Sequence, residues 1–322
     1  MAEKPLVSII ILNYNGAALL QECITSVEKT RYAPVEIMVV DNASTDDSII
    51  LLEKFPGVKI IGNKRNYGYA EGNNIGIAQS RGKYFVTLNN DVTVEPDWLD
   101  KPLAHLEGNE RIGAVSCRQM SYADHEIIDG LFHYFKPDLT MLPFGEQRKM
   151  GEDPRFSMTG RVFSANGGSA VIRRKMFDEV GGFDARFFAY LDEVDLCMRA
   201  FLYDWWVVYA PEAVVYHKGS VSFKKTGIRK YYFRERNRFW FLYKYYPVSY
   251  LLKHVIPLLI MELRVIRVMC VVMLKPQWYF KARLEAITGF RKYKAVRVEN
   301  LKRMRERWKK FIELKRKMFI SL

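Results

Sequence analysis

Three polar residues, Asn89, Asn90 and Asp91, directly follow residues 84–88, an apolar and β-prone run of strand length. In an open α/β sheet, ligands bind outside the carboxyl ends of the strands, which is where this triplet is expected to lie. A carboxylate next to uncharged oxygen donors suits a hard divalent cation that also holds substrate phosphates. Asn and Asp also favour turns, so the triplet alone predicts either a metal site or an ordinary turn.

Two further polar segments occur in the first hundred residues. Asp41 and Asn42 end the apolar run at residues 35–40, and the Asp41 carboxylate can accept a hydrogen bond from a nucleotide base. The oxygen-bearing side chains at residues 44–47 can equally cap the helix that follows. Residues 65–76 contain three glycines and three asparagines, which allow close backbone approach and amide hydrogen bonds to a sugar diphosphate. This segment lacks the Lys-Ser/Thr pattern of a P-loop, so simple ATP hydrolysis is not indicated.

An acidic pair, Asp192 and Glu193, follows a segment rich in aromatic residues. Adjacent carboxylates in such surroundings suit a general base whose pKa is raised by burial and by like charge. Asp195 and Arg199 are four residues apart, and on a helix this spacing predicts a structural ion pair. His217 is isolated in the sequence, and by itself it favours a solvated surface histidine over a metal ligand.

The elements that must position these residues alternate along the first part of the chain. Four apolar runs have the length and composition of strands, at residues 7–12, 35–40, 58–61 and 84–88. Three segments between them have helical length and apolar spacing, at residues 17–29, 46–55 and 70–80. Strand alternating with helix predicts an α/β fold with a doubly wound, mostly parallel sheet.

Beyond residue 115 this alternation stops, and three prolines before residue 165 predict a long irregular segment. The alternation resumes with an apolar run at residues 167–172 and a helix over residues 193–203. We therefore expect a second part of the fold that returns to the sheet after the irregular segment.

The composition excludes a wholly disordered chain, because 49% of the residues are hydrophobic and 14% are aromatic. The four cysteines are scattered, without a Cys-X-X-Cys pair, which favours a reduced, cytosolic protein. The apolar run at residues 7–12 is too short for the core of a signal peptide, so it is interpreted as a strand.

The net charge of +14 is divided unevenly along the chain. Residues 1–217 carry 22 Lys and Arg against 30 Asp and Glu, a net charge of −8, whereas residues 218–322 carry 28 against 6, a net charge of +22. Such asymmetry predicts an acidic catalytic body and a basic tail that faces a membrane surface or a nucleic acid.

The apolar segment at residues 250–274 is interrupted by charged residues, so its uncharged stretches are shorter than the ~20 residues of a membrane-spanning helix. Lys253, Arg264 and Arg267 fall close together on a helical wheel, which predicts an amphipathic surface helix with a kink at Pro257. Such a helix can lie on a membrane, pack on the body of the protein or join a second subunit.

Taken in order, seven motifs closely resemble those of the inverting glycosyltransferases of family 2, in the rhamnosyltransferase-like branch with the GT-A fold. The motifs are Asn13-Tyr14-Asn15-Gly16, Asp41-Asn42-Ala43-Ser44-Thr45-Asp46, Arg65-Asn66-Tyr67-Gly68, Asn89-Asn90-Asp91, Gly181-Gly182-Phe183-Asp184, Asp192-Glu193-Val194-Asp195-Leu196 and Tyr216-His217. The resemblance covers roughly residues 5–245. It implies a GT-A catalytic domain over residues 1–230, with a donor-binding half to about residue 115 and an acceptor-binding half after it. A basic amphipathic helical region over residues 231–322 would then associate with membranes or oligomerise.

The resemblance also implies a role for individual residues. Glu193 occupies the position of the catalytic base, with Asp192 beside it, and Asp91 and His217 are implied as ligands of Mn²⁺ or Mg²⁺. The residues implied to bind the nucleotide sugar are Asn13, Asn15, Asp41, Asn42, Arg65, Asn66, Gly68, Asn74 and Asn90. The residues implied to bind the acceptor are Gly167, Gly168 and Asp192.

The chain departs from the family pattern at three points. Asn89 stands where the Asp-X-Asp metal motif has its first acid, which leaves Asp91 as the expected direct ligand. The order Asp192-Glu193 inverts the commoner Glu-Asp order, so the identity of the base remains open between the two. The Gln-X-X-Arg-Trp motif of processive members is absent, which favours the addition of a single sugar.

The implied activity is metal-dependent, inverting transfer of one sugar, with rhamnose as the first choice, from a dTDP- or UDP-sugar. The acceptor is expected to be a hydroxyl of a lipid-linked glycan in cell-surface polysaccharide synthesis. We expect a cytoplasmic enzyme, peripheral on the inner face of the cell membrane, and leave homo-oligomerisation open.

Two other classes of protein share some of these features. A sugar nucleotidyltransferase would carry a Gly-rich basic signature after the first strand, where this chain has Asn13-Tyr14-Asn15-Gly16. A non-enzymatic nucleic-acid or membrane-binding protein with a degenerate GT-A body would explain the basic tail, but not Asp91, Glu193 and His217 in family order. No nucleic-acid partner is therefore expected.

Overall fold

The computed structural model describes residues 3–136, 139–219, 227–317 and 319–321. Within these ranges the chain forms a large central sheet of eleven strands and a small sheet of three. The strands of the central sheet are β1 (Val7–Asn13), β2 (Val35–Asp41), β3 (Val58–Gly62), β4 (Tyr84–Asn89), β5 (Val92–Val94), β6 (Ile112–Ser121), β7 (Ile128–Gly130), β10 (Gly160–Val162), β12 (Ser169–Arg173), β13 (Trp206–His217) and β14 (Phe319–Ser321). The strands of the small sheet are β8 (Phe132–Phe135), β9 (Met141–Pro143) and β11 (Ser164–Ala165).

One half of the central sheet is parallel, with β3, β2, β1 and β4 as neighbours in that order. In this register Asn13 lies opposite Asp41, and Leu12 lies opposite Asn89. The polar residues that follow β1, β2 and β4 therefore meet at one edge of the sheet, as the sequence predicts. The expected α/β fold with a mostly parallel sheet is confirmed.

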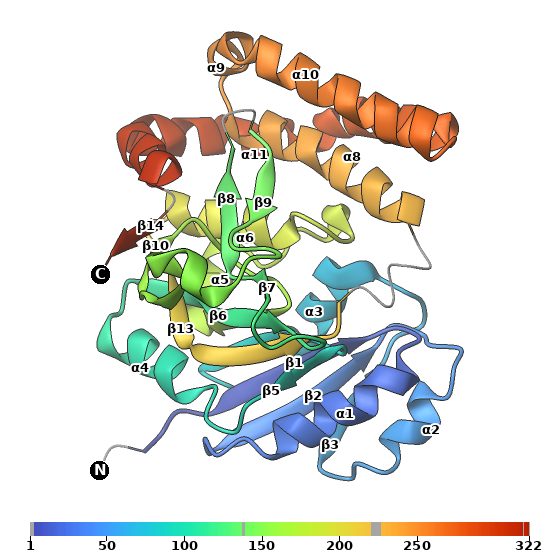
Figure 1. Ribbon diagram of the computed structural model, residues 1–322, viewed down its shortest axis with the longest axis vertical. Coiled ribbons are helices and arrows are strands. Elements are labelled where there is room, and N and C mark those ends of the chain that lie inside the picture. Colours follow the sequence, from blue (N-terminus) through green and yellow to red (C-terminus); the bar gives the residue numbers. More distant parts are fainter. Residues whose placement is uncertain (1–2, 137–138, 220–226, 318, 322) are drawn as a thin grey trace.

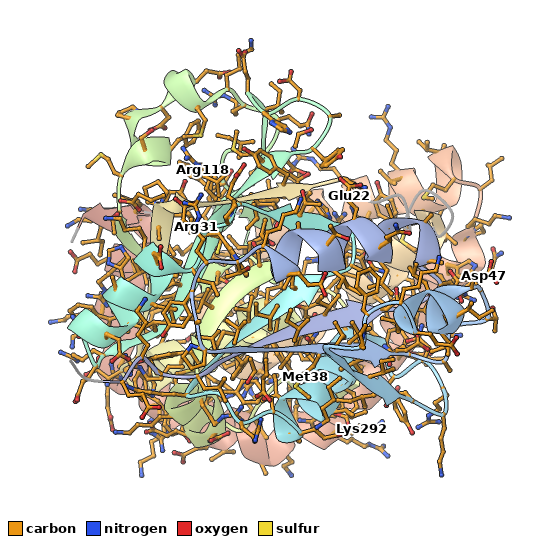
Figure 2. All side chains as sticks on the ribbon, turned by 90° about the horizontal axis from the view of Figure 1, so that it is seen from below. Glu22, Arg31, Met38, Asp47, Arg118 and Lys292 are labelled. Carbon is orange, nitrogen blue, oxygen red and sulfur yellow. The ribbon has the colours of Figure 1, made fainter. Side chains whose placement is uncertain are left out.

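Helices cover both faces of the sheet (Figures 1 and 2). The apolar sides of α1 (Ala17–Glu28), α2 (Ser48–Leu52) and α4 (Asp100–Gly108) belong to the core on one face. Met38, on the other face, belongs to a second core with α3 (Gly68–Ala78), α5 (Arg174–Val180) and α6 (Asp192–Leu202). In Figure 2, α1 and the labelled Met38 lie on opposite sides of the strands.

The segment expected to be irregular, residues 115–165, is rich in short strands instead. β6 runs antiparallel to β12 and parallel to β13, and β7 pairs with the end of β6. β8 joins β9 and β11 in the small sheet. These strands have only three or four residues in most cases, so their apolar alternation is too short to stand out in the sequence.

The C-terminal region is helical, with α8 (Gly227–Tyr245), α9 (Val248–Lys253), α10 (Val255–Ile266), the π-helical η4 (Arg267–Val272) and α11 (Pro276–Lys317). The amphipathic segment breaks at His254, between α9 and α10, and Pro257 lies in the first turn of α10, where proline is tolerated. No helix in the described ranges has the length and apolar character needed to cross a membrane.

α8 and α11 pack directly on α6, on its side away from the sheet (Figure 1). Phe187, Leu191 and Val194 form a third core with Phe241 and Tyr293, and all five are buried. The boundary expected after residue 230 falls inside α8. α6 therefore has the sheet on one side and the basic helical region on the other.

Candidate active site

The pairing of β5 with β13 brings Asp91 and His217 together. Val92 lies opposite His217 in this antiparallel pair, and Oδ2 of Asp91 is 3.2 Å from Nε2 of His217. On the other side of the ring, Nδ1 of His217 lies 2.9 Å from Oδ2 of Asp129, in β7. Gln119 donates to the same Asp129 oxygen at 2.6 Å. His217 is thus held between two carboxylates and is not a solvated surface histidine.

The two carboxylates change the titration of the imidazole. Burial alone would lower the pKa of His217, but hydrogen bonds to Asp129 and Asp91 and the charges of both outweigh it and raise the pKa to about 10. Burial also opposes the ionisation of Asp129, and the hydrogen bond and charge of His217 nevertheless lower the pKa of this carboxyl.

Asp91 and His217 form a donor set that fits a divalent cation. No group of three or more His, Cys, Asp or Glu in the described residues is arranged to hold a metal ion. Mg²⁺ and Mn²⁺ sites commonly use one or two protein ligands and take the remaining oxygens from substrate phosphates and water. A carboxylate on the second ring nitrogen, as Asp129 is for His217, is the usual support of a metal-binding histidine.

The ends of β1, β2 and β4 are joined by side-chain hydrogen bonds. Asn13 donates to Oδ1 of Asp41 at 2.8 Å, and Asn90 donates to the amide oxygen of Asn13 at 2.6 Å. Ser44 closes the turn after β2, its hydroxyl donating to Oδ1 of Asp41 at 2.6 Å and its backbone N–H donating to Oδ2 at 2.8 Å. The carboxylate of Asp41 is therefore fixed in position, and Oδ2 keeps a lone pair for a further donor.

The turn before α3 carries Asn66 and Gly68. Asn66 accepts a hydrogen bond from the N–H of Gly68 at 2.8 Å, and Asn42 donates to the carbonyl of Gly68 at 3.0 Å. Gly68 has a φ of +79°, and a Cβ at this position would lie 2.4 Å from the carbonyl oxygen of Phe188. Only glycine fits there, and its contact with Phe188 joins this turn to the loop that precedes the acidic pair.

The other three residues expected to bind the donor have partners within the protein. The side-chain oxygen of Asn15 accepts from the N–H of Thr45 at 2.7 Å. The Arg65 guanidinium lies 4.8 Å from the ring centroid of Tyr67. The amide of Asn74 donates to and accepts from the backbone of Phe183, at 2.9 and 3.0 Å. Contact of these residues with a nucleotide sugar stays a prediction.

α6 begins with the acidic pair and gives its two carboxyl groups different environments. Asp192 is 1% exposed, and neither of its carboxyl oxygens has a hydrogen-bond partner in the described part of the chain. Burial and then the negative charge of Glu193 raise the pKa of Asp192 well above its usual range, which favours its neutral form. The Glu193 side chain is 17% exposed, and its Oε1 lies 3.7 Å from Nε2 of His133. Further along α6, the expected ion pair of Asp195 and Arg199 is present at 3.0 Å.

The Gly167-Gly168 turn before β12 lies between the acidic pair and the end of β4. A Cβ on Gly167 would lie 3.3 Å from Cβ of Glu193. A Cβ on Gly168 would lie 3.1 Å from the amide nitrogen of Asn89 and 3.2 Å from the amide oxygen of Gln119. A larger residue at either position would press against these side chains, so the two glycines allow the acidic pair and the end of β4 to approach each other closely.

Four side chains of the site carry no sequence signal that identifies them. Asp129, Gln119 and His133 lie in the segment that was expected to be irregular, and only the register of β6, β7 and β8 brings them to the site. Tyr69 lies within the Gly- and Asn-rich segment, and its hydroxyl donates to the carbonyl of Gly167.

Comparison with known proteins gives consistent matches. The sequence model of glycosyl transferase family 2 matches residues 8–181, more than half of the chain. An uncharacterized glycosyltransferase of Haemophilus influenzae is 36% identical over 119 residues, which cover 36% of this chain and 37% of the relative. The N-acetylglucosaminyl-diphospho-decaprenol L-rhamnosyltransferase of Mycobacterium tuberculosis is 26% identical over 239 residues, which cover 66% of this chain and 76% of the relative.

A solved structure with a similar fold is mannosyltransferase PcManGT from Pyrobaculum calidifontis in complex with GDP-Man and Mn²⁺. The match has a TM-score of 0.54 and 18% sequence identity, and it covers 74% of this chain and 64% of that chain. The chain spans well under two thirds of the length of the Haemophilus relative.

Proposed function

This chain belongs to glycosyl transferase family 2, and we propose that it transfers a single sugar from a nucleoside diphosphate sugar to an acceptor hydroxyl, with inversion of the anomeric centre. The observation that carries the proposal is the arrangement around the Gly167-Gly168 turn, with Glu193 against one glycine and the end of β4, next to Asp91 and His217, against the other. A departing diphosphate requires positive charge, which a cation held by Asp91 and His217 would supply, and an attacking hydroxyl requires a base, which Glu193 can supply.

The edge formed by β1 and β2 is the proposed site of the nucleoside. The free lone pair of Asp41 can accept from the ring N–H of thymine or uracil, because both bases carry a donor there. The turn with Asn66 and Gly68 would line the sugar and diphosphate. A dTDP- or UDP-sugar fits this description, and the name of the Mycobacterium relative makes rhamnose the first candidate sugar.

Asp91 and His217 would hold the divalent metal, with Asp129 fixing the imidazole through Nδ1. When bound, Mn²⁺ or Mg²⁺ supplies positive charge that offsets the charge building on the departing diphosphate. Asn90, tied to Asn13, keeps the end of β4 in place beside these ligands.

Glu193 is the proposed general base. Its carboxylate takes the proton of the attacking hydroxyl as that oxygen displaces the diphosphate from the opposite face of the sugar, and one such displacement inverts the anomeric centre. Asp192, buried next to Glu193 in the first turn of α6, and the Gly167-Gly168 turn are the proposed acceptor-side residues.

The acceptor is proposed to be a lipid-linked glycan, which would place the enzyme on the cytoplasmic face of a membrane. The Mycobacterium relative is named for a decaprenol-linked acceptor. On α10, Ile256, Leu259 and Leu263 are 68%, 58% and 65% exposed and share one side of the helix by their spacing. Basic residues near an anionic lipid surface contribute on the order of 1 kcal/mol each, and the region after residue 217 has a net charge of +22.

Ion pairs join the inner side of α10 to α8 and α11. Glu262 accepts from Arg238 of α8 at 3.0 Å and from Arg283 of α11 at 2.5 and 2.9 Å. This pairing explains how an acidic residue occurs in an apolar segment, and it leaves the apolar side of α10 facing outwards. α11 contributes buried Tyr293 to the core around α6, so truncation after residue 246 would damage the body of the protein.

Substitutions on the full-length chain test the membrane proposal. Ile256, Leu259 and Leu263, all changed to Gln, should weaken binding to vesicles rich in anionic phospholipid by roughly tenfold per residue, because each loses part of its apolar transfer energy. Ile50→Gln is the matched control, since Ile50 is 62% exposed on α2, far from this face. If wild-type protein ignores such vesicles at low salt and the triple variant changes a dimer to a monomer, the face is an oligomer interface.

A screen of nucleotide sugars tests the proposed activity. Thermal unfolding with each donor, with and without Mn²⁺ or Mg²⁺, should reveal protection by one nucleoside diphosphate sugar only when metal is present. The protecting donor should then label a polyprenyl-diphosphate glycan with one sugar of inverted anomeric configuration. Protection by a sugar 1-phosphate with a nucleoside triphosphate, and by no nucleotide sugar, would support a nucleotidyltransferase instead.

A further inference from the structure

The loop that leads into the acidic pair, residues 187–191, has an unusual backbone. Phe188, Tyr190 and Leu191 have φ values of 66°, 69° and 64°, in the left-handed region that is unfavourable for residues with a Cβ. Glu193 follows within the first turn of α6. A loop of this kind keeps its shape only where its surroundings hold it, so the groups that hold it also set the position of Glu193.

Asn237 of α8 holds this loop by its side chain. The amide nitrogen lies 2.9, 2.8 and 2.8 Å from the carbonyl oxygens of Phe187, Ala189 and Tyr190, which share its two N–H donors. Asn237 is fully buried, so these carbonyl groups have no water to replace it.

The orientation of the Asn237 amide is itself fixed. The guanidinium of Arg236 donates to the side-chain oxygen of Asn237 at 3.0 Å, and it also donates to the carbonyl of Phe187 at 2.9 Å. Because an arginine can only donate, the oxygen of Asn237 must face it and the NH₂ group must face the loop.

The other side of the same loop contacts the proposed donor-binding turn. The carbonyl oxygen of Phe188 accepts from the N–H groups of Tyr69 and Ala70, at 2.6 and 3.2 Å. The ring of Phe188 stacks on Phe233 of α8, with centroids 4.8 Å apart. The loop therefore spans the space between the turn at Gly68 and α8, with the acidic pair at its end.

We propose that Asn237 is a positioning residue for the general base: by fixing the carbonyls of Phe187, Ala189 and Tyr190 it sets the pose of Glu193 relative to the bound donor. The inference rests on the proposed transferase activity and extends it, because it assigns part of the active-site support to the basic helical region. A purely structural Asn237 would change the thermal stability of the protein without selectively changing turnover.

Asn237→Ala removes both N–H donors that the three carbonyl groups share and leaves the rest of α8 unchanged. We expect kcat for sugar transfer to fall about 10–100-fold, because a misplacement of catalytic groups by about 1 Å has effects of this size. The KM for the donor should stay within about threefold, and amide hydrogen exchange of residues 189–193 should become at least about tenfold faster. Asn300→Ala is the control, since Asn300 is a buried asparagine of α11 whose amide nitrogen has no partner among the described residues.

A double-mutant cycle separates positioning from general destabilisation. If Asn237 acts through Glu193, adding Asn237→Ala to Glu193→Gln should lower kcat by no more than about twofold further, since the group that Asn237 positions is already inactive. Losses that multiply in the double variant, or an unchanged kcat in a less stable Asn237→Ala protein, would overturn the proposal.

A second variant and a second measurement test the role of Asn237 if the first variant does not fold or no activity is found. If Asn237→Ala does not fold, Asn237→Ser retains one donor and should give an intermediate loss of kcat with the same non-additivity. If wild-type protein transfers no sugar from any donor, the proposed function fails, and hydrogen exchange still decides the loop: unchanged exchange at residues 189–193 in the folded variant refutes the role of Asn237.

Discussion

Glu193→Gln and Asp192→Asn form a pair of isosteric changes that assign the general base. Both variants keep the shape of the side chain and remove its ability to accept a proton. The two carboxyl groups differ in environment, since Asp192 is 1% exposed without hydrogen-bond partners in the described part of the chain, whereas the Glu193 side chain is 17% exposed. The pair should therefore respond very differently to the same chemical change.

The expected losses follow from these environments. Glu193→Gln should lower kcat by about 10²–10⁴-fold, the usual contribution of such proton transfer, or roughly 3–5 kcal/mol of transition-state stabilisation. Asp192→Asn replaces a carboxyl whose neutral form is already favoured with a neutral amide, so kcat should change by less than about tenfold.

Asp192→Asn should also change the dependence of stability on pH. Burial and the charge of Glu193 raise the pKa of Asp192 in the native protein above its value of about 3.9 in the unfolded chain. The native state therefore keeps a proton that the unfolded state releases. As the pH rises from the pKa of the unfolded state to that of the native state, the free energy of unfolding falls by about 1.4 kcal/mol per pH unit. The variant has no such proton, so its free energy of unfolding should fall less than that of wild type as the pH rises from about 4 to 8.

The assay is single-turnover transfer with saturating donor, combined with urea unfolding between pH 4 and 8. Nucleotide affinity, measured by calorimetry, should be unchanged in both variants, because the base acts on the acceptor. Near-normal turnover in Glu193→Gln together with an inactive Asp192→Asn would reverse the assignment. An Asp192→Asn protein with the pH profile of wild type would contradict the argument on its protonation.

Two further changes test other parts of the site and its support. Asp91→Ala should abolish Mn²⁺-dependent binding of the nucleoside diphosphate while leaving the fold intact, and an unchanged Mn²⁺ affinity in calorimetry with nucleotide present would contradict its role as ligand. Lys244→Met should lower the free energy of unfolding by about 1–3 kcal/mol, because the buried Asp184 and Asp195 lose one cationic partner and keep only Arg186 and Arg199. Burial opposes the ionisation of Asp184, but Lys244 and then Arg186 lower its pKa to about 2, so wild-type stability from this group should be lost as the pH falls from about 4 to 2. In urea unfolding, the free energy of unfolding should fall less in Lys244→Met than in wild type as the pH is lowered over this range. An identical fall in both proteins would show that Lys244 does not lower the pKa of Asp184.

The parallel half of the sheet could be predicted because local pattern and global fold agree there. Residues 7–12, 35–40, 58–61 and 84–88 are largely apolar runs with one polar residue each, and each is a strand in the structure with bounds within one residue. Parallel strands aligned side by side bring their carboxyl ends to one edge, so Asp41 and the polar triplet after β4 were expected to meet.

The environment of His217 could not be predicted in the same way. Asp91 and His217 become neighbours only because Val92 pairs with His217 across more than a hundred residues of sequence. Asp129 reaches the ring through β7, which has three residues and no periodicity of its own. Contacts of this kind depend on the register of long-range strand pairs, which a local pattern does not specify.

The basic C-terminal region shows that a net charge counted from the sequence does not predict which charged side chains are exposed. Arg236, Arg238 and Lys244 contribute to the net charge of +22, yet all three are buried and bonded to backbone carbonyls or carboxylates. Removing them from water is tolerated only because their partners are in place, so α8 cannot shift without breaking these contacts. The basic region, whose composition predicts a separate tail at the surface, therefore packs on the catalytic body through buried residues. These residues lie beside the loop that precedes the proposed base. The proposed membrane contact on the outer side of α10 and the pose of Glu193 on the inner side of α8 would thus depend on one packed set of helices.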